Sequence, residues 1–587
     1  MENITIKING VEVSAPAGST ILEAARLAHI DIPTLCYLKE INEIGACRMC
    51  IVEVKGARSL VASCVYPINP GMEVWTNTPK VIESRKKPLE LLLSNHKKEC
   101  LSCVRSGNCE LQQLCKELGV EDENYYSGEM TPAMIDTSAA HMVRDNSKCI
   151  LCRRCSAVCE KVQGIGVIGP NERGFKSYIG TAFNMDLADT SCVSCGQCIA
   201  VCPTGALYEK DNTDEIFAAI ADPDKYVVVQ TAPSVRAGLG EEFGYPMGTD
   251  VEGKMVAALR RLGFDKVFDT DFAADLTIME EAHEFLDRVQ NGGKLPLITS
   301  CSPGWIKYCE HYFPDMTENP EFIDNLSSCK SPQQMFGATL KTYFAEKMGI
   351  DPKKIVSVSV MPCTAKKFEI GRDDEDAAGV PDVDIAITTR ELARMIKKVG
   401  LMFNELPDEQ FDNPMGESTG AAVIFGATGG VMEAALRTAV ETLTGEELKN
   451  VEFQEVRGTE GIKEATYNVA GMDISVAVAS GLGNARKLLD KVKSGEANYH
   501  FIEIMGCPGG CVNGGGQPQV RGSVRNFTDV RAIRAKALYD NDAAKPIRKS
   551  HENPAIQQLY KEYFGEPGSH KAHEVLHTTY VKRVINK

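Results

Sequence analysis

The pattern of apolar and polar positions along the chain changes near residue 220. Before that point, residues 4–13 alternate on either side of Asn9-Gly10, a dipeptide that favours the tight turn of a β-hairpin. Thr20 and Glu23 then form a capping box, which predicts a short helix. A hairpin and a helix ahead of the first cysteines predict a small α+β domain that ends at about residue 78.

Beyond residue 220 the pattern predicts alternating strands and helices. The predicted buried strands are the short apolar runs Tyr226–Val229, Ile355–Val360 and Phe501–Ile504. The predicted amphipathic helices are Met255–Leu262, Ala274–Val289 and Arg390–Lys398. Such alternation indicates an α/β domain with a largely parallel sheet. Cys363 and Cys507 each follow a predicted strand, where α/β sheets tend to bind ligands.

Composition narrows the classes of function. The chain has 587 residues and a formal net charge of −16, which argues against nucleic-acid binding because that requires a basic surface. No apolar run approaches the roughly 20 residues of a membrane helix, and the first residues lack a signal-peptide pattern, so we expect a cytoplasmic protein. The 22 cysteines are the main clue, because clustered cysteines in such a chain more often bind metal than form disulfides.

The first two groups of cysteines have the spacing of iron–sulfur ligands. Four thiolates can hold a [2Fe–2S] cluster, and an imidazole can replace one thiolate on iron. Zinc is an alternative occupant of either group, since it takes the same ligands. The first group is Cys36, Cys47, Cys50 and Cys64, and the second is His96, Cys100, Cys103 and Cys109.

Two further groups match the run of bacterial two-cluster ferredoxins, in which the fourth cysteine of each run ligates the other cluster. The first run carries Glu160 where proline is usual. One predicted [4Fe–4S] ligand set is Cys149, Cys152, Cys155 and Cys202; the other is Cys192, Cys195, Cys198 and Cys159.

Three stretches after residue 220 carry a resemblance that covers nearly the whole chain. They are Thr299–Trp305, Met361–Glu369 and Glu503–Pro518, and they resemble the signature motifs of the iron–iron hydrogenases. The [2Fe–2S] and His/Cys groups resemble a module that this family shares with the large cluster-bearing subunit of NADH dehydrogenases. The residues from about 530 onward resemble the small-subunit segment of the family.

The resemblance implies an H-cluster, which is a [4Fe–4S] cubane joined through a cysteine to a two-iron site with CO, cyanide and a bridging dithiolate amine. Cys363, Cys507 and Cys511 would ligate the cubane, Cys511 would bridge to the two-iron site, and Lys366 would hydrogen-bond a cyanide. Ordinary core packing is the alternative for Phe425 and Met361, and a surface lysine is the alternative for Lys366. The positions that match the family's cofactor pocket are Ala232, Pro233, Gln333, Met361, Phe425, Gly426 and Met505.

The first motif departs from the commonest form of the family, which has two adjacent cysteines. One of those ligates the cubane and the other relays protons, whereas this chain has Cys301 followed by Ser302. Thiolate suits iron far better than a neutral hydroxyl, so we expect Cys301 to be the fourth ligand and Ser302 to relay protons. The opposite assignment stays open.

A proton path is implied by four further matches to the family: Glu281, Glu284, Arg288 and Ser327. Glu281 and Glu284 are three residues apart in a predicted helix, so they share one face, and Arg288 continues it. An exposed charged stripe is the alternative. No nucleotide fingerprint is evident, because Gly426–Gly430 lacks the Gly-Lys-Ser/Thr of a phosphate loop.

We therefore predict a multidomain α+β and α/β protein with N-terminal ferredoxin-like iron–sulfur modules, an α/β H-cluster domain and a short helical tail. The predicted domains are 1–78 ([2Fe–2S]), 79–118 (His(Cys)3-ligated [4Fe–4S]), 139–212 (two [4Fe–4S]), 222–525 (H-cluster) and 530–587 (small-subunit-like tail).

The predicted function is reversible oxidation of dihydrogen in an anaerobic setting, with electron transport through one [2Fe–2S] and three accessory [4Fe–4S] clusters. A flavin- and NAD(P)-binding diaphorase subunit would be the partner, with ferredoxin as the rival, and maturation proteins would load the H-cluster. No nucleic acid or membrane partner is expected. The alternatives are a stand-alone ferredoxin-dependent hydrogenase, a hydrogen sensor, a non-catalytic electron-transfer subunit resembling the NADH dehydrogenase subunit, and a related cluster-assembly protein.

Overall fold

The computed structural model describes residues 2–121, 132–316 and 321–583. Met1 and residues 584–587, the outer ends of the first and last predicted domains, lie outside the described residues. The chain forms two compact units. Unit 1 comprises residues 1–190, 197–208 and 519–528, and unit 2 comprises residues 191–196, 209–518 and 529–587.

Unit 1 begins with the predicted hairpin. Strands β1 (Asn3–Ile8) and β2 (Val11–Pro16) pair antiparallel around Asn9 and Gly10, whose φ angles of 50° and 85° explain why this turn uses an Asn-Gly pair. The capping box of Thr20 and Glu23 is formed at the start of α1 (Ile21–Leu27). Strands β1 and β2 join β3 (Ile51–Val54), β4 (Val61–Ala62) and β5 (Glu73–Trp75) in a five-stranded sheet.

Residues 79–118, the second predicted domain, form two helices with an irregular stretch between them. Helix α2 (Pro79–Ser94) and helix α3 (Glu110–Leu118) flank residues 95–109, which hold His96 and three cysteines. Buried Arg154 forms a bidentate ion pair with Glu110 at the start of α3, with nitrogen–oxygen distances of 2.8 and 3.1 Å. That pair fixes α3 beside the short helix α4 (Arg154–Ala157).

Unit 2 contains two four-stranded sheets where the sequence predicts one largely parallel sheet. The first is fully parallel, in the order β12 (Lys266–Asp269), β11 (Tyr226–Thr231), β14 (Ile355–Met361) and β15 (Ile385–Thr388). The second runs β13 (Leu297–Ile298), β18 (Phe501–Met505), β17 (Met472–Ser480) and β16 (Ile462–Val469), and only its outer β16–β17 pair is antiparallel. The predicted α+β and α/β class is confirmed, with the α/β part divided between two sheets.

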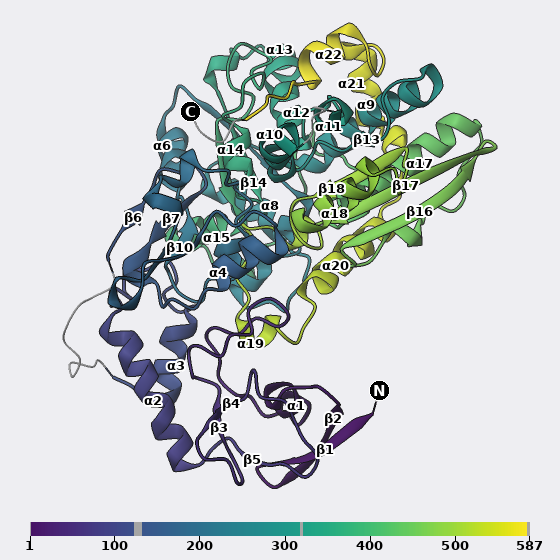
Figure 1. Ribbon diagram of the computed structural model, residues 1–587. Coiled ribbons are helices and arrows are strands. Elements are labelled where there is room, and N and C mark those ends of the chain that lie inside the picture. Colours follow the sequence, from purple (N-terminus) through teal and green to yellow (C-terminus); the bar gives the residue numbers. More distant parts are fainter. Residues whose placement is uncertain (1, 122–131, 317–320, 584–587) are drawn as a thin grey trace. The chain divides into compact units, whose positions relative to one another are not determined.

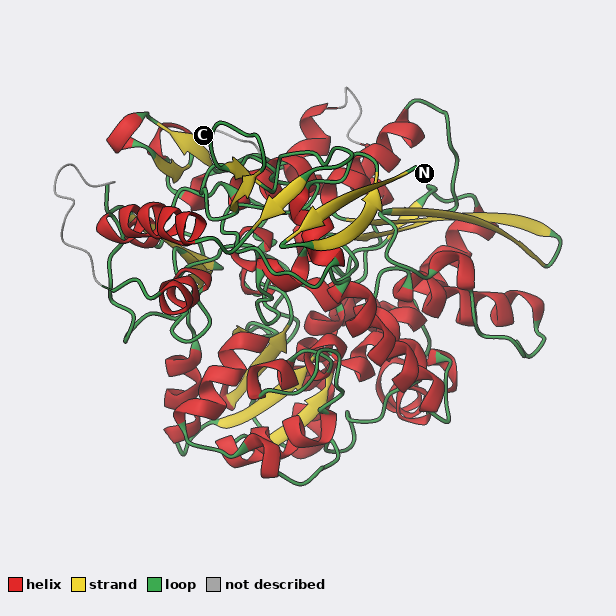
Figure 2. Cartoon of the chain, turned by 90° about the horizontal axis from the view of Figure 1, so that it is seen from below, coloured by secondary structure: helices red, strands yellow, loops and turns green. Residues whose placement is uncertain are grey.

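Helices cover these sheets (Figures 1 and 2). Helices α8 (Glu252–Leu262) and α15 (Thr389–Lys398) pack on one face of the first sheet. Helix α9 (Thr270–Asn291) contributes Phe272 and Leu276 to the core on the other face, and Ile278 and Phe285 to the core of the second sheet. It therefore belongs to both cores. Among the described residues, no helix has the length and apolar character needed to cross a bilayer.

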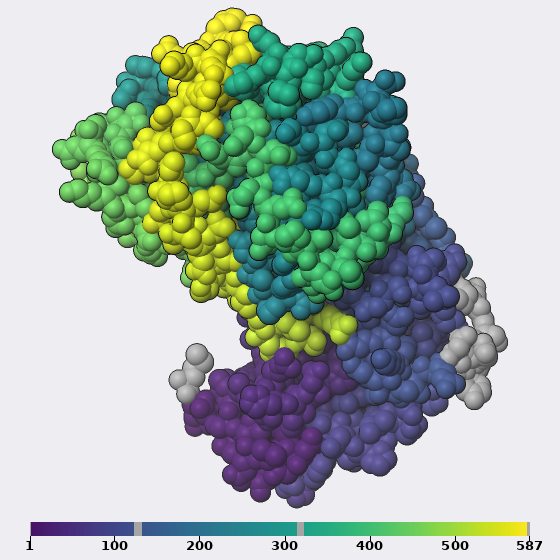
Figure 3. Space-filling view, turned by 180° about the vertical axis from the view of Figure 1, so that it is seen from behind, coloured from purple at the N-terminus to yellow at the C-terminus, as the bar shows by residue number. Residues whose placement is uncertain are grey.

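The C-terminal tail is integrated into unit 2. It forms α20 (Val530–Ala544), α21 (Pro554–Leu559) and α22 (His570–Leu576), and α21 and α22 bury Ile556, Leu559 and Leu576 in the core that includes α9. Figure 3 shows it as a band across one face of the unit. In α20, Asp542 pairs bidentately with Arg437 of α17 (Gly430–Thr444) at 2.9 Å, and both side chains are fully buried.

We expect Asp542→Ala to loosen the tail, because Arg437 would keep Glu433 but lose its second counter-charge inside the protein. Breaking a buried pair costs about 3–5 kcal/mol, and we expect about 3 kcal/mol here. Urea unfolding, followed by circular dichroism, measures the loss. Asp540→Ala on the same helix is the control, because its partner Lys536 is exposed and such pairs are worth about 0–1 kcal/mol. Equal effects of the two variants would contradict the anchoring role.

Candidate active site

A cavity of about 540 Å³ in unit 2 contains most of the predicted active-site positions. The strands of both sheets end at it, because Ala232 follows β11, Cys363 follows β14 and Met505 ends β18. Among the residues that line it are Cys301, Lys366 and Cys511, together with all seven predicted pocket positions: Ala232, Pro233, Gln333, Met361, Phe425, Gly426 and Met505. Met361 and Phe425 line the cavity and are also packed in the core, since they are only 2% and 6% exposed.

The glycine run after Cys511 lets two loops meet at the cavity. A Cβ on Gly514 would lie 2.1 Å from the carbonyl oxygen of Pro362, so a larger residue here would displace the loop that carries Cys363. This close approach of backbone to backbone brings the loops of Cys363 and Cys511 together.

The cavity thiols are buried and form no disulfide. Burial raises the pKa of Cys363, raises that of Cys511 to about 12, and raises that of Cys301 well above its usual range. Without a nearby cation these groups would therefore be neutral thiols. Iron would provide the positive charge that stabilises the thiolates, so the donor set fits an iron cluster.

Lys366 is buried beside this cavity, with 8% of its surface exposed, so the surface-lysine alternative is wrong. Its ammonium donates to Glu369 at 2.8 Å, to Ser331 at 2.7 Å and to the carbonyl oxygen of Cys301 at 3.4 Å. Gln333 also donates to Glu369, at 3.0 Å. Sequence reasoning missed Glu369 and Ser331, although the Lys-x-x-Glu spacing on a helix was a signal for the first.

Cys301 and Ser302 occupy different surroundings. Cys301 lines the cavity with Cys363 and Cys511, and the charge of Glu281 acts on it. Ser302 is not among the lining residues, and its hydroxyl accepts a hydrogen bond from the backbone N–H of Gly506 at 3.0 Å. Gly506 precedes Cys507, so Ser302 lies beside that cysteine's loop.

The four predicted proton-path residues meet on one side of α9. Glu281 is 1% exposed, and its carboxylate makes no close hydrogen bond among the described residues, although Ser327 and the backbone of Ser300 lie near enough to favour its charged form. Burial, and next the charge of Glu284, raise its pKa to about 8. Glu284 accepts from Ser327 at 3.0 Å and from Arg288 at 2.5 Å. The exposed-stripe alternative is therefore wrong for Glu281.

In unit 1, the thiols of the first group face one another, and the Sγ atoms of Cys50 and Cys64 are 3.3 Å apart. A hydrogen bond from Cys36 lowers the pKa of Cys47 to about 6, despite its burial. Cys115, a cysteine outside the four predicted sets, packs with the cluster of apolar residues around α2 and α3. All these cysteines are free of disulfides.

The next two groups surround cavities of unit 1. His96, Cys100, Cys103 and Cys109 line one of about 280 Å³, and burial lowers the pKa of His96, which keeps its imidazole neutral as a ligand requires. Another, of about 380 Å³, is lined by Cys149, Cys152, Cys155 and Cys202, the set that crosses the two runs. In the remaining set, Cys159 and Cys198 belong to unit 1 and Cys192 and Cys195 to unit 2.

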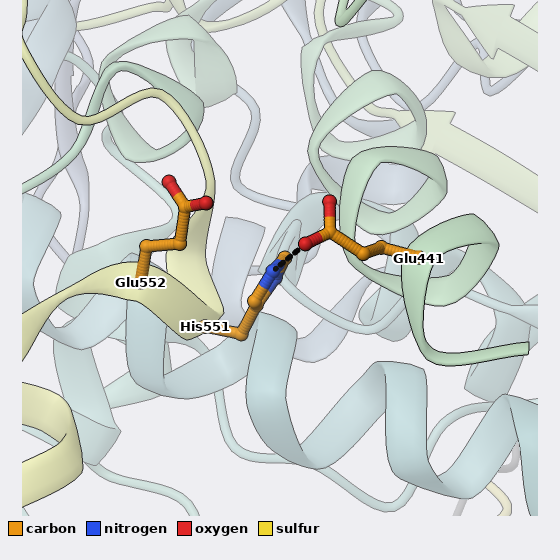
Figure 4. Close-up of side chains that lie close together, drawn as sticks. All are labelled: Glu441, His551 and Glu552. Carbon is orange, nitrogen blue, oxygen red and sulfur yellow. Dashed lines mark ion pairs between the residues drawn. The ribbon is translucent and has the colours of Figure 1, made fainter. Parts of the chain in front are cut away.

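The spacing of these side chains disfavours zinc. Four ligands about 2.3 Å from zinc lie about 3.8 Å from one another in a tetrahedron. Among the described residues, the one trio with ligand atoms within 4.8 Å of each other is Glu441, His551 and Glu552 (Figure 4). Cys50 and Cys64 approach each other as a pair, but no trio of cysteines in the three groups of unit 1 lies this close together, so the groups fit a cluster of several atoms better than a single zinc ion. Lys549 lies 2.7 Å from Glu441 and 3.0 Å from Glu552, which makes that trio an ion-pair network.

Known protein families match segments of both units. Residues 225–515 match the C-terminal domain of the iron only hydrogenase large subunit, and residues 528–583 match the iron hydrogenase small subunit. Residues 1–79 match a 2Fe-2S iron-sulfur cluster binding domain, 85–124 the NADH-ubiquinone oxidoreductase-G iron-sulfur binding region, and 148–206 a 4Fe-4S dicluster domain. The predicted ferredoxin-like modules ahead of a catalytic domain are thus confirmed.

Individual relatives agree. The chain is 54% identical to the NADP-reducing hydrogenase subunit HndD of Solidesulfovibrio fructosivorans, over 99% of this chain and 100% of the relative. It is 44% identical to iron hydrogenase 1 of Clostridium pasteurianum, over 98% and 100%. A solved structure of a variant of the apo [FeFe]-hydrogenase HydA1 from Chlamydomonas reinhardtii matches with a TM-score of 0.56 and 44% identity, over 64% of this chain and 99% of that one.

We expect Glu281→Gln to change how stability depends on pH. The native pKa of about 8 lies above the ordinary value of 4.5, so the unfolded carboxyl loses its proton first. As pH rises from 4.5 to 8, the wild type should lose about 1.4 kcal/mol per pH unit from this group, while the glutamine variant should not. Urea unfolding at pH 5.5 and 8 measures the difference. Asp287→Asn, an exposed neighbour on α9, is the control. Identical pH dependence in wild type and Glu281→Gln would contradict the argument.

Proposed function

Because this chain belongs to the iron–iron hydrogenase family and is a hydrogenase, we propose that it interconverts dihydrogen with protons and electrons at the cavity of unit 2. We further propose that the electrons pass through four iron–sulfur clusters to or from an NAD(P)-linked partner. The observation that carries the proposal is the cavity itself, where Cys301, Cys363 and Cys511 lie beside buried Lys366.

The residues around the cavity suit an H-cluster. Cys363, Cys507 and Cys511 would ligate its cubane, and Cys511 would also bridge to the two-iron part. When bound, the cluster supplies the redox chemistry and the place where dihydrogen binds. Lys366, held by Glu369, offers a hydrogen-bond donor to an anionic ligand such as cyanide, and the apolar walls exclude water.

We propose Cys301 as the fourth cubane ligand because thiolate suits iron far better than a neutral hydroxyl. Cys301 lines the cavity with Cys363 and Cys511, whereas Ser302 and the proposed ligand Cys507 are not among its lining residues. Ser302, whose hydroxyl keeps its proton for donation while it accepts from Gly506, would relay protons. The opposite assignment, with Cys301 as the proton relay, relies on the electrostatic effect of Glu281 on Cys301 and is tested below.

Glu281 has the environment of a proton carrier. With a pKa of about 8, its carboxyl can hold a proton near neutral pH and release it without a large energetic cost. Glu284 and Ser327, which are hydrogen-bonded to each other, would continue the path outward. Arg288 donates to Glu284 and to the carbonyl oxygen of Leu326, so it holds Glu284 in position.

The electron path would comprise one [2Fe–2S] cluster and three accessory [4Fe–4S] clusters on the four predicted ligand sets. The NADH dehydrogenase-like match over residues 85–124 supports the His96 set. No partner follows from the sites themselves. Similarity to a subunit of an NADP-reducing hydrogenase favours a flavin- and NAD(P)-binding diaphorase partner, and ferredoxin stays the rival. A cytoplasmic location and a need for maturation proteins remain predictions.

The alternative functions account for fewer of the structural observations. An electron-transfer subunit resembling that of NADH dehydrogenase accounts for unit 1 but not for the cavity in unit 2. A cluster-assembly protein or a hydrogen sensor would not require a buried carboxyl between the cavity and Glu284. The decisive assay is hydrogen evolution from reduced viologen by protein made anaerobically with maturation enzymes, since viologen bypasses the partner. Protein with CO and cyanide infrared bands but no hydrogen would favour a sensor, and protein without those bands an electron-transfer or assembly role.

We expect Glu281→Gln to abolish hydrogen turnover while the infrared bands of CO and cyanide persist. The amide cannot exchange the proton, and a positioned acid–base group contributes about 10²–10⁴-fold to a rate. Asp287→Asn is the matched control on the exposed side of α9 and should turn over normally. Near-normal hydrogen production by Glu281→Gln would refute this path.

The roles of Cys301 and Ser302 can be separated in protein made without maturation enzymes, which tests the cubane alone. If Cys301 is the fourth ligand, Cys301→Ala should lower the iron content and the cubane's electron paramagnetic resonance signal, because thiolate is the preferred ligand of iron. Ser302→Ala should retain both. The reverse result would assign the ligand to position 302 and the relay to Cys301.

A further inference from the structure

A second hydrogen-bonded chain leaves Glu284 on the side away from the cavity and ends in the C-terminal tail. Ser328 donates its backbone N–H to Glu284 at 3.1 Å, and its hydroxyl oxygen lies 3.3 Å from the same carboxyl group. The same hydroxyl lies 2.8 Å from Nδ1 of His577. Nε2 of His577 lies 3.1 Å from Glu280. None of the predicted path residues accounts for Ser328, His577 or Glu280.

We propose that His577, reached through Ser328, carries protons between Glu284 and solvent. This rests on the proposed function, because it extends the path from Glu281 to Glu284. The C-terminal tail would then contribute a proton-carrying residue to the catalytic cycle, in addition to covering the core.

Arg288 cannot itself act as this proton carrier. A guanidinium remains protonated in proteins, so Arg288 can hold the carboxylate of Glu284 but cannot take up and release its proton. Imidazole is the side chain that changes charge near neutral pH, and its two nitrogens let a proton enter at one and leave from the other. His577 is the imidazole connected to Glu284 by hydrogen bonds among the described residues.

The backbone sets the position of His577. Lys330 N–H donates to the carbonyl oxygen of Leu576 at 2.8 Å, and Thr578 N–H donates to that of Ser328 at 2.9 Å. These bonds form a short antiparallel bridge between Cys329 and His577. Relay geometry therefore does not depend on a flexible side chain alone.

Glu280 orients the ring. Its side chain is fully buried, and hydrogen bonds from His577, Tyr560 and the N–H of Gly568 lower its pKa although burial opposes this. A carboxylate on Nε2 holds that proton on the ring and leaves the lone pair of Nδ1 for the Ser328 hydroxyl. It also stabilises an imidazolium, since a charge-assisted hydrogen bond is stronger than a neutral one.

Proton transfer along this chain is balanced. Glu284 in its acid form gives its proton to Oγ of Ser328, while Ser328 gives its hydroxyl proton to Nδ1 of His577. Only O–H and N–H bonds form and break, and no electron moves. The Nε2–H bond then breaks as its contact with Glu280 opens, and that proton passes to water at the 8% of the side chain that is exposed, where the ring lies 4.0 Å from the ring of exposed His573. This leaves a neutral ring protonated at Nδ1, which exchanges its proton with solvent to regain its starting tautomer. Hydrogen evolution uses the same steps in reverse.

The other titratable groups around His577 are compatible with this role. Glu280 contacts Nε2 of His577 directly, Glu284 is connected to the ring through Ser328, and Arg288 is already engaged by Glu284. Tyr560 donates to Glu280, and the thiol of Cys329 is neutral because burial raises its pKa well above the usual range. The ring of His573 on α22 lies 4.0 Å from the ring of His577.

The test uses the complete chain loaded with its H-cluster, assayed with reduced viologen in dilute non-imidazole buffer. His577→Ala should lower kcat about tenfold, less than the roughly 10²–10⁴-fold of an obligatory acid–base group, because Glu284 keeps 16% side-chain exposure as a direct exit. The KM for viologen and the CO and cyanide bands should not change. Added imidazole should restore the rate by entering the vacated space.

Two further variants make the test specific. Ser328→Ala keeps the His577–Glu280 pair and the backbone bond to Glu284, so it should fold and lose rate without rescue by imidazole. His570→Ala removes an imidazole from the same helix that is 90% exposed, and it should match the wild type. Normal rates in His577→Ala or Ser328→Ala, or a loss in His577→Ala that imidazole does not relieve, would overturn the proposal.

The comparison with Glu281→Gln separates this inference from the proposed function. If Glu281→Gln stops turnover while His577→Ala does not change it, the inner path stands and the exit through the tail is wrong. If Glu281→Gln turns over normally, the inner path fails, and the exit that depends on it fails too.

Discussion

The structure of unit 2 depends on burying a helix that carries three carboxyl groups within five residues. Helix α9 belongs to the cores of both sheets, so Glu280, Glu281 and Glu284 cannot all face water. Each is accommodated differently. Glu280 is ionised by hydrogen bonds from the tail, Glu281 makes no close hydrogen bond among the described residues and is most stable protonated, and Glu284 is held by Arg288 and two serines. A single helix thus holds three carboxyl groups in three different environments, and the proposed proton path uses two of them.

The buried cysteines raise the same difficulty as the buried carboxyl groups, but here positive charge from a bound metal can offset the cost of the charged form. Burial makes the thiolates of the unit 2 cavity costly, and among the described residues that line this cavity only one carries a positive charge. Lys366 is the ammonium beside the cavity, and it is already paired with Glu369. Positive charge from iron is therefore part of what stabilises these loops, because binding a metal that only the folded state can ligate adds to the stability of that state. Cofactor loading and folding of the cavity are expected to be coupled.

Much of this was predictable where the signal was local. The turn at Asn9-Gly10, the capping box of Thr20 and the strand ahead of Cys363 depend on neighbouring residues, and each was found as predicted. Strand pairing is not local, so one sheet was predicted where two exist. The cavity positions came from resemblance to a family, and their roles remain proposals. Ser328 and His577 are 249 residues apart in sequence and belong to no recognisable motif, so only the folded structure brings them together.

The placement of His577 also has a consequence for how the protein is made. A ribosome synthesises Glu281 and Glu284 almost three hundred residues before the tail that supplies His577 and the partners of Glu280. Until α21 and α22 dock, the carboxylate of Glu280 and the apolar faces packed by Ile556 and Leu576 lack their covering. The emerging catalytic region is then open on that side until the last helices fold into place, and any factor that loads the proposed cofactor from that side would have access only during this period.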